Sequence, residues 1–263
     1  MGLKNEHDSH TLHALQTTVC DSPSTFFGIE GDSYFDNLAN HIVASRDFVE
    51  EISKLPEAPV IVDVGANLGV TSMIASRMRP LAAIIAFEPS PKAFRCLSKT
   101  FHYNEVKNCK LINKALGNKV GSVSFVEAEF LAGSYLASEA AEASNVEVEL
   151  TTLDTVVEEM KLARLDFIKI DVEGFELDVL QGASQTIQNF KPKMFMEFNS
   201  FAISANRNMS PRLVLDYILD HFKSFSVDRA GKKIEVRTPK EARDFLFYNM
   251  AMLTHGVDDI VFS

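Results

Sequence analysis

Apolar residues along the chain form short β-branched runs that alternate with segments of helical spacing. Residues 60–64, Val-Ile-Val-Asp-Val, are one such run, which is typical of a parallel strand covered on both faces. Further runs predict strands at 81–87, 110–114, 122–126, 146–150, 166–170 and 194–198. Segments with an apolar stripe, such as 70–78, predict helices between them. This alternation predicts an α/β fold in one domain, residues 59–263.

Residues 1–58 precede the first of these strands and are expected to form a partly helical N-terminal extension. Residues 1–25 are polar and rich in Ser, Thr and His, so we expect them to be mobile until they pack on something. Two short amphipathic helices should follow, since apolar residues recur at helical spacing at Tyr34, Leu38 and Ile42, and again at Phe48, Ile52 and Leu55. The extension either closes over a ligand as a lid or covers one edge of the sheet.

A glycine turn follows the strand at 60–64. Gly65 ends the strand, and Gly69 stands just before the helix, as in the first half of a nucleotide-binding βαβ unit. The dinucleotide fingerprint needs a middle glycine, where this chain has Ala66 and Asn67. Asp63, just before the turn, would repel a phosphate. The loop therefore suits a nucleoside whose other end carries an ammonium and a carboxylate.

An acidic residue ends the next strand. Glu88 follows Gly69 by close to the ~20 residues expected of an acid that accepts both hydrogen bonds of a ribose diol. The same charge would reject a 2′-phosphate. Alternatively, Glu88 only caps the following helix, where Ser90 is a good N-cap and Pro91 a good first residue.

Three motifs together resemble the FkbM-type methyltransferases: Asp-Val-Gly-Ala-Asn-Leu-Gly at 63–69, Phe-Glu-Pro-Ser-Pro at 87–91 and Ile-Asp-Val-Glu-Gly-Phe-Glu at 170–176. The resemblance implies a Rossmann-like methyltransferase fold, with a mainly parallel, doubly wound sheet of seven strands and an antiparallel edge strand. It also implies S-adenosylmethionine as cofactor and S-adenosylhomocysteine as product. The expected cofactor-binding residues are Asp63, Gly65, Ala66, Asn67, Gly69, Glu88, Pro89, Ala115 and Asp171.

The third motif supplies candidate catalytic residues. Asp171 and Glu173 follow one predicted strand and Glu197 lies at the tip of the next, where ligands of open α/β sheets bind. Methyl transfer is an in-line displacement that depends on alignment, and a hydroxyl acceptor also benefits from a base. We expect Asp171 to hold the amino-acid end of the cofactor or to orient the acceptor, and Glu173 or Glu197 to be the base. Glu173 could instead only fix its own loop.

Two further features leave alternatives open. Asp171, Glu197 and Asn199 could offer oxygen ligands to magnesium, but no pattern requires a metal and we expect none. The segment 127–145 is rich in Ala, Ser and Glu, and it is either a lid that faces the acceptor or a plain insertion.

Composition bears on partners and compartment. The net charge of −10 weighs against a nucleic-acid substrate, which needs a basic face. No apolar run approaches the ~20 residues of a membrane span, and the N-terminus lacks the apolar region of a signal peptide. Cys20, Cys96 and Cys109 are odd in number and lack a C-x-x-C spacing, so we expect buried free thiols in a reducing cytoplasm.

We therefore expect a cytoplasmic methyltransferase that acts on a hydroxyl of a small molecule or glycan, an acceptor class that the resemblance alone implies. One rival is a catalytically silent module that binds the cofactor or a partner. Another is an NAD-dependent oxidoreductase, which Ala66 and the missing middle glycine disfavour. The oligomeric state stays open, with a homodimer as one alternative.

Overall fold

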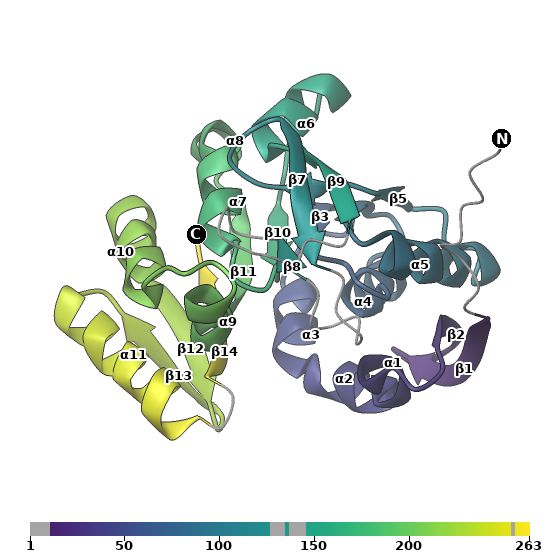
Figure 1. Cartoon of the computed structure of the whole chain (residues 1–263), viewed down its shortest axis with the longest axis horizontal. Helices are drawn as coiled ribbons and strands as arrows, with labels where there is room; N and C mark the ends of the chain where they lie inside the picture. The colour runs from purple at the N-terminus through teal and green to yellow at the C-terminus, as the bar shows by residue number, and fades with distance from the viewer. Residues whose placement is uncertain (1–10, 127–134, 137–145, 254–255) are drawn as a thin grey trace, which may run out of the picture.

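The computed structural model describes residues 11–126, 135–136, 146–253 and 256–263 (Figure 1). Its central sheet contains, within these residues, the strands β3 (Val60–Val64), β4 (Ala83–Phe87), β5 (Cys109–Ile112), β10 (Phe167–Ile170), β11 (Lys193–Asn199), β12 (Phe225–Arg229), β13 (Lys232–Val236) and β14 (Val257–Phe262). Their spatial order is β13-β12-β14-β11-β10-β3-β4-β5.

Five neighbouring strands of this sheet, β5, β4, β3, β10 and β11, run parallel. The strand β14 is antiparallel to both of its neighbours, β11 and β12. The prediction of a mainly parallel sheet is confirmed. Two details differ: β13 adds an eighth strand among the described residues, and the antiparallel β14 lies inside the sheet because it inserts between β11 and β12.

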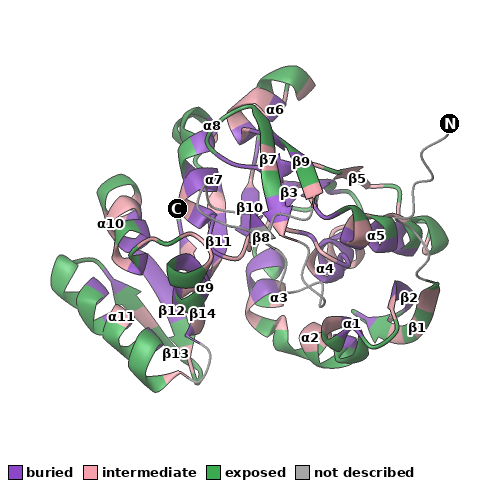
Figure 2. Cartoon of the chain, viewed as in Figure 1, coloured by how far each residue is buried: buried purple, intermediate pink, exposed green. Residues whose placement is uncertain are grey.

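Helices cover both faces of the sheet (Figures 1 and 2). On one face lie α3 (Arg46–Ser53), α4 (Val70–Met78) and α5 (Pro91–Tyr103). On the other lie α6 (Leu153–Met160), α7 (Glu176–Gly182), α8 (Ser184–Phe190) and α10 (Pro211–Phe222). Successive strand residues point to opposite faces, so Val62, Val64, Ile85, Phe87, Ile168 and Ile170 pack in one core and Ile61, Ile84, Ala86 and Phe167 in the other. The fold is therefore doubly wound.

The N-terminal extension contains structure that the sequence analysis missed. Strands β1 (Leu12–Val19) and β2 (Ser22–Ile29) form an antiparallel hairpin within the residues expected to be mobile. Its two-residue turn has positive φ at Cys20 and Asp21, the backbone of a type I′ turn, although neither is the Gly or Asn that usually signals one. The hairpin packs on α5, where Asn104 Oδ1 accepts from Thr25 N at 2.9 Å and Thr100 Oγ1 accepts from Phe27 N at 3.0 Å.

Three short helices, α1 (Ser33–Asp36), α2 (Leu38–Ala44) and α3, follow the hairpin, where the sequence predicted two. Apolar residues of the hairpin and of these helices, Val19, Phe26, Phe35, Leu38, Phe48 and Ile52, belong to the same buried cluster as α4 and α5. The described part of the extension is thus packed against the α/β core.

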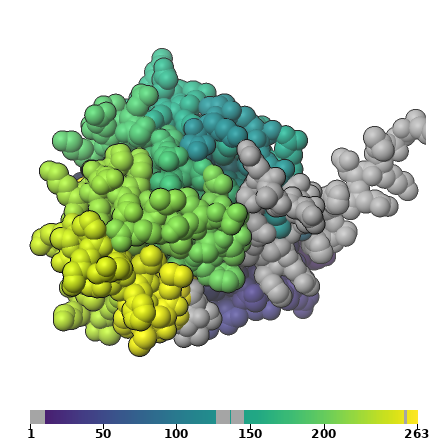
Figure 3. Space-filling model, turned by 60° about the vertical axis from the view of Figure 1, so that its left-hand side comes forward, coloured from purple at the N-terminus to yellow at the C-terminus, as the bar shows by residue number. Residues whose placement is uncertain are grey.

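The C-terminal part was only partly predicted. The sequence predicts short extended pieces at 225–228, 234–236 and 259–262, and these became parts of strands β12, β13 and β14, but the long helix α11 (Pro239–Met252) was missed. It begins with a capping box between Thr238 and Glu241, with Pro239 in its first turn. Together with α10 and the short α9 (Ser200–Ala205), it forms the green-to-yellow surface that faces the viewer in Figure 3.

A second, smaller sheet lies near the carboxyl ends of the parallel strands. It consists of β6 (Ala115–Leu116), β7 (Gly121–Val126), β8 (Tyr135–Leu136) and β9 (Val146–Thr151), in the order β6-β9-β7-β8. Apart from β8, the predicted lid segment 127–145 lies outside the described residues.

Among the described residues, no helix is both long and apolar enough to cross a bilayer. Cys20 is exposed, against the expectation that the thiols are buried.

Candidate active site

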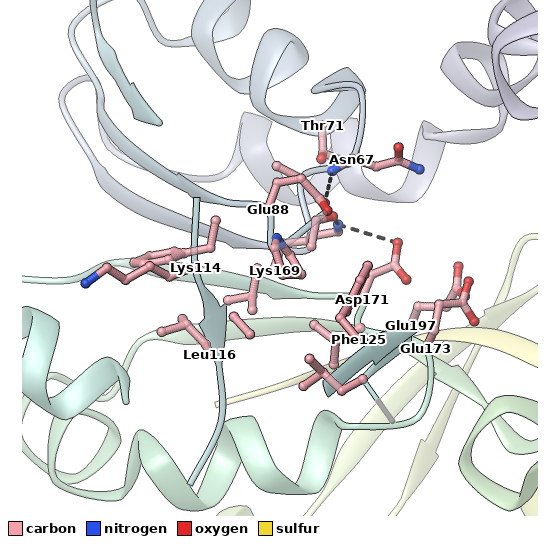
Figure 4. A pocket seen from close by; sticks show the side chains of 18 of the residues that line it. Asn67, Thr71, Glu88, Lys114, Leu116, Phe125, Lys169, Asp171, Glu173 and Glu197 are labelled. Carbon is pink, nitrogen blue, oxygen red and sulfur yellow. Dashed lines mark hydrogen bonds and ion pairs between the residues drawn. The ribbon is translucent and has the colours of Figure 1, made fainter. Parts of the chain in front are cut away.

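A pocket of about 260 Å³ lies at the carboxyl ends of β3, β4, β10 and β11. This is the edge at which open α/β sheets bind ligands. The predicted site residues among those that line it are Gly65, Ala66, Asn67, Glu88, Pro89, Ala115, Asp171, Glu173 and Glu197. Figure 4 shows that Glu173 and Glu197 lie together at one end, while Lys114 lies at the other.

The turn after β3 is pinned to the neighbouring strands. Gly65 N and Ala66 N both donate to Phe87 O, at 3.0 and 2.9 Å. Gly65 has φ +79°, and a Cβ built on it would lie 1.8 Å from Asp171 O. Only glycine allows both the left-handed backbone and this close approach. The turn therefore brings the first and third motifs into direct contact.

Glu88 joins the turn to the start of α5. Its Oε2 accepts from Asn67 N and its Oε1 from Ser90 N, both at 2.8 Å (Figure 4 draws the first). The side chain is buried, and burial raises the pKa of Glu88 to about 7. Ser90 caps α5 by accepting from Ala93 N. Glu88 thus organises the helix start, as its alternative role predicted, and also lines the pocket, where each oxygen has a further lone pair.

Two residues predicted to bind the cofactor lie behind the pocket wall. Asp63 is 2% exposed, and its Oδ2 accepts from the hydroxyls of Thr71 at 2.8 Å and Ser72 at 2.6 Å. Gly69 faces α5, since a Cβ there would lie 2.5 Å from both Leu97 Cδ1 and Phe101 Cε2. Both residues therefore shape the pocket from behind.

Lys169, in the middle of the buried strand β10, is a site residue that the sequence analysis missed. Its Nζ lies 3.2 Å from Asp63 Oδ1 and 3.5 Å from Asp171 Oδ2, and it donates to Gly65 O at 2.7 Å. Burial disfavours its charge, but the two aspartates outweigh burial and raise the pKa of Lys169, so it stays an ammonium. A lysine within an otherwise apolar, doubly covered strand was the signal, because such a charge needs a buried partner.

Asp171, Glu173 and Glu197 form an acidic cluster in which one ligand atom from each carboxylate lies within 4.8 Å of the others. Burial, followed by the charge of Asp171, raises the pKa of Glu173 to about 8. The same two causes raise the pKa of Glu197 well above its ordinary value. Because burial and the nearby Asp171 raise the pKa of both glutamates, we expect the pair to retain at least one proton at neutral pH.

Hydrogen bonds hold the Glu173 loop in place. Glu173 has a positive φ of 52°, Asn206 Nδ2 donates to its carbonyl at 3.0 Å, and Asn199 Nδ2 donates to its Oε2 at 3.3 Å. The amide oxygen of Asn199 accepts from Ala202 N at the start of α9. That oxygen is therefore engaged in capping a helix, which weakens the magnesium set that includes Asn199. The expectation of no metal stays a prediction.

Side chains from outside the three motifs complete the wall. Tyr34 and His41 come from α1 and α2, and Phe125 and Leu136 from the smaller sheet. None of the four was predicted as a site residue. They follow no local motif, and only the packing of distant segments brings them to the carboxyl edge of the large sheet.

The chain is similar in sequence to known methyltransferases. The chain matches the methyltransferase FkbM domain over residues 63–237. It is 32% identical over 170 residues to methyltransferase sdnD of Sordaria araneosa, covering 53% of this chain and 66% of that protein.

Two other relatives are more distant. Hexuronic acid methyltransferase AglP of Haloferax volcanii is 28% identical over 139 residues, covering 52% of this chain and 55% of AglP. The 2-O-methyltransferase NoeI of Sinorhizobium fredii is 27% identical over 146 residues, covering 49% of this chain and 59% of NoeI. The chain thus matches between about half and two thirds of the length of these relatives. Because the domain match covers well over half of the chain and contains all three motifs, the chain belongs to the FkbM methyltransferase family.

Proposed function

We propose that the protein is an S-adenosylmethionine-dependent methyltransferase that acts on a hydroxyl group of a small molecule or glycan. One observation carries the proposal: a single pocket joins the buried Glu88 and its glycine turn to the acidic cluster of Asp171, Glu173 and Glu197. The names of AglP and NoeI, which specify a hexuronic acid and O-methylation, support a hydroxylated acceptor.

The residues present fit the cofactor. Glu88 can accept the ribose diol with the lone pairs that the backbone amides leave unused. Asn67 also lines the pocket, and its buried side-chain oxygen has no hydrogen-bond partner among the described residues, so a ligand donor would satisfy it. Pro89 and Ala115 would lie along the adenine, and Asp171 would accept from the ammonium. When bound, the cofactor supplies an electrophilic methyl group on a sulfonium.

The acidic cluster fits the acceptor side. A general base works best when its pKa lies near the operating pH, and burial brings the pKa of Glu173 to about 8. We propose that the carboxyl pair of Glu173 and Glu197 acts as the base that accepts the proton of the acceptor's hydroxyl. Asp171, held by Lys169 at 3.5 Å, orients the hydroxyl or the ammonium.

Calorimetric titration with S-adenosylhomocysteine, with NAD as the control ligand, tests the cofactor. We expect micromolar binding of S-adenosylhomocysteine alone. Hydrogen bonds to a charged group are worth about 1.5–3 kcal/mol each, so Glu88→Ala should weaken binding by about tenfold or more. Glu88→Gln keeps the shape of the side chain and should lose less affinity for S-adenosylhomocysteine. Binding of NAD alone would establish the oxidoreductase instead.

Turnover separates an enzyme from a silent module. With S-adenosylmethionine and a panel of hydroxylated acceptors, we expect release of S-adenosylhomocysteine that depends on the acceptor. Asp171→Ala should abolish this release without unfolding the chain, which circular dichroism would verify. Near-normal turnover of the variant would remove Asp171 from the mechanism. A protein that binds the cofactor and turns over none of the acceptors would support the silent module.

A further inference from the structure

Part of the pocket wall comes from outside the stretch that matches the family. Tyr34 on α1 and His41 on α2 both line the pocket, whereas the family match begins at residue 63. Their rings are stacked, with centroids 4.0 Å apart and planes 20° from parallel. Two aromatic rings from the N-terminal extension thus lie face to face in the wall of the site.

Tyr34 is placed by a chain of tertiary contacts. The neighbouring Phe35 is 4% exposed, and its backbone N–H is capped by Asp32 Oδ1 at 2.9 Å. Phe35 lies against Gly28 of β2 so closely that a Cβ on Gly28 would be 2.2 Å from Phe35 Cδ2. Because β2 is hydrogen-bonded to α5, the hairpin fixes Phe35 and therefore the position of Tyr34.

Tyr34 lines the same pocket as Asp171, Glu173 and Glu197. Burial raises the pKa of Tyr34, and the charges of Asp171 and Glu197 raise it further, which outweighs the lowering by Lys169. The hydroxyl of Tyr34 therefore remains protonated and can donate. Burial lowers the pKa of His41, which keeps that ring neutral. The stacked pair of Tyr34 and His41 is therefore uncharged at neutral pH.

The acidic end of the pocket disfavours anions. It holds the carboxyl groups of Asp171, Glu173 and Glu197, and the buried Lys169 is already paired with two aspartates, Asp63 and Asp171, so the aspartates outnumber this cation even where the glutamates are protonated. A negatively charged acceptor would meet this excess of negative charge in a partly buried site. A neutral ring can lie on an aromatic face while its hydroxyls donate to the carboxylates.

Resting on the proposed function, we propose that Tyr34, backed by His41, recognises the acceptor. It receives the face of a neutral ring that carries hydroxyl groups, and it directs one hydroxyl toward Glu173 and Glu197. The N-terminal extension thus sets the acceptor specificity of a domain whose cofactor residues belong to the family match. By this reasoning the acceptor differs in charge from the hexuronic acid named for AglP.

The test compares acceptors that differ by one charge. The probes are the methyl pyranosides of glucose, galactose and mannose, each beside its uronic acid counterpart, with release of S-adenosylhomocysteine as the readout. We expect at least one neutral glycoside to react at least about tenfold faster, by kcat/KM, than its acidic counterpart.

Variants then assign the effect to Tyr34. We expect Tyr34→Ala to lower kcat/KM for the neutral glycoside about tenfold or more, mainly by raising KM, while the Kd of S-adenosylhomocysteine changes less than twofold. Tyr34→Phe keeps the ring and its packing, so it should fold normally, and its kcat/KM for the neutral glycoside should fall less. Val43→Ala is the matched control on the helix that carries His41, because Val43 is 78% exposed, and it should change neither quantity.

The other outcomes overturn the inference. They are no transfer to the neutral glycosides, a preference for the acids, or unchanged kcat/KM in Tyr34→Ala. A loss of S-adenosylhomocysteine affinity in Tyr34→Ala that matches the loss of transfer would assign the residue to the cofactor instead. The calorimetric titration keeps two failures apart: without binding of S-adenosylhomocysteine the proposed function fails too, whereas binding without transfer to the neutral glycosides overturns only this inference.

Discussion

Replacing Gly65 with alanine tests whether the glycine turn is what brings the first and third motifs together. The residue has φ +79°, and the added Cβ would lie 1.8 Å from the carbonyl oxygen of Asp171. That distance is far below van der Waals contact, and the atom in the way is backbone. The segment that carries Asp171 must therefore shift relative to the turn.

Two costs add in this variant. Left-handed backbone costs a residue with a Cβ about 1–2 kcal/mol. Forcing extra volume into a packed site costs about 1–3 kcal/mol more. We therefore expect Gly65→Ala to lower the free energy of unfolding by about 2–5 kcal/mol, a large share of the ~5–15 kcal/mol of a typical domain. For a chain of this size the melting temperature should fall by about 4–20 °C.

Gly231 provides a matched control. It has the same φ of +79°, but a Cβ built on it would meet no atom of the described residues within 4 Å. Gly231→Ala should therefore cost only the backbone term of about 1–2 kcal/mol. Urea denaturation of both variants measures the difference, and calorimetry with S-adenosylhomocysteine measures its effect on the site. We expect a loss of affinity of about tenfold or more in Gly65→Ala, and none in Gly231→Ala.

Equal free energies of unfolding for the two variants would refute this reasoning, because the close approach to Asp171 would then cost nothing. Unchanged affinity for S-adenosylhomocysteine in Gly65→Ala would separately show that the cofactor does not depend on this turn.

Three other changes probe the site and its support. Lys169→Met leaves buried carboxylates without their cation and should cost about 3–5 kcal/mol of unfolding free energy in urea, whereas Lys114→Met, at a surface ion pair, should cost under about 1 kcal/mol; similar losses would deny Lys169 its role. The pKa of Glu173 is raised from 4.5 to about 8, so between these values the folded chain keeps a proton that the unfolded chain releases. Its stabilising contribution is therefore complete below pH 4.5 and is lost as the pH rises to about 8, and Glu173→Gln should flatten this decline in urea titrations at several pH values; an unchanged slope would contradict the shift. Gly28→Ala should displace Phe35, cost about 1–3 kcal/mol and reduce acceptor turnover more than S-adenosylhomocysteine affinity; a change in affinity alone would contradict the path from the hairpin to the acceptor.

Local pattern accounts for the part of the fold that the sequence predicted. The β-branched run at Val60–Val64 and the amphipathic segment at Val70–Met78 became β3 and α4. Strand and helix periods are local properties, so they can be read without knowing what packs against them. The hairpin β1–β2 was not predicted because its turn residues, Cys20 and Asp21, do not include the glycine that usually indicates such a turn.

The candidate site also has a part that local sequence pattern predicts and a part that it does not. Motif spacing and strand order were enough to predict the glycine turn, Glu88 at a strand tip and the acidic residues of the third motif at one edge of the sheet. The sequence did not predict that Asp63 turns away from the pocket toward Lys169, or that Tyr34 enters the pocket from the N-terminal extension. Burial, ion pairing and ring stacking depend on contacts between residues far apart in the chain, which no local period encodes.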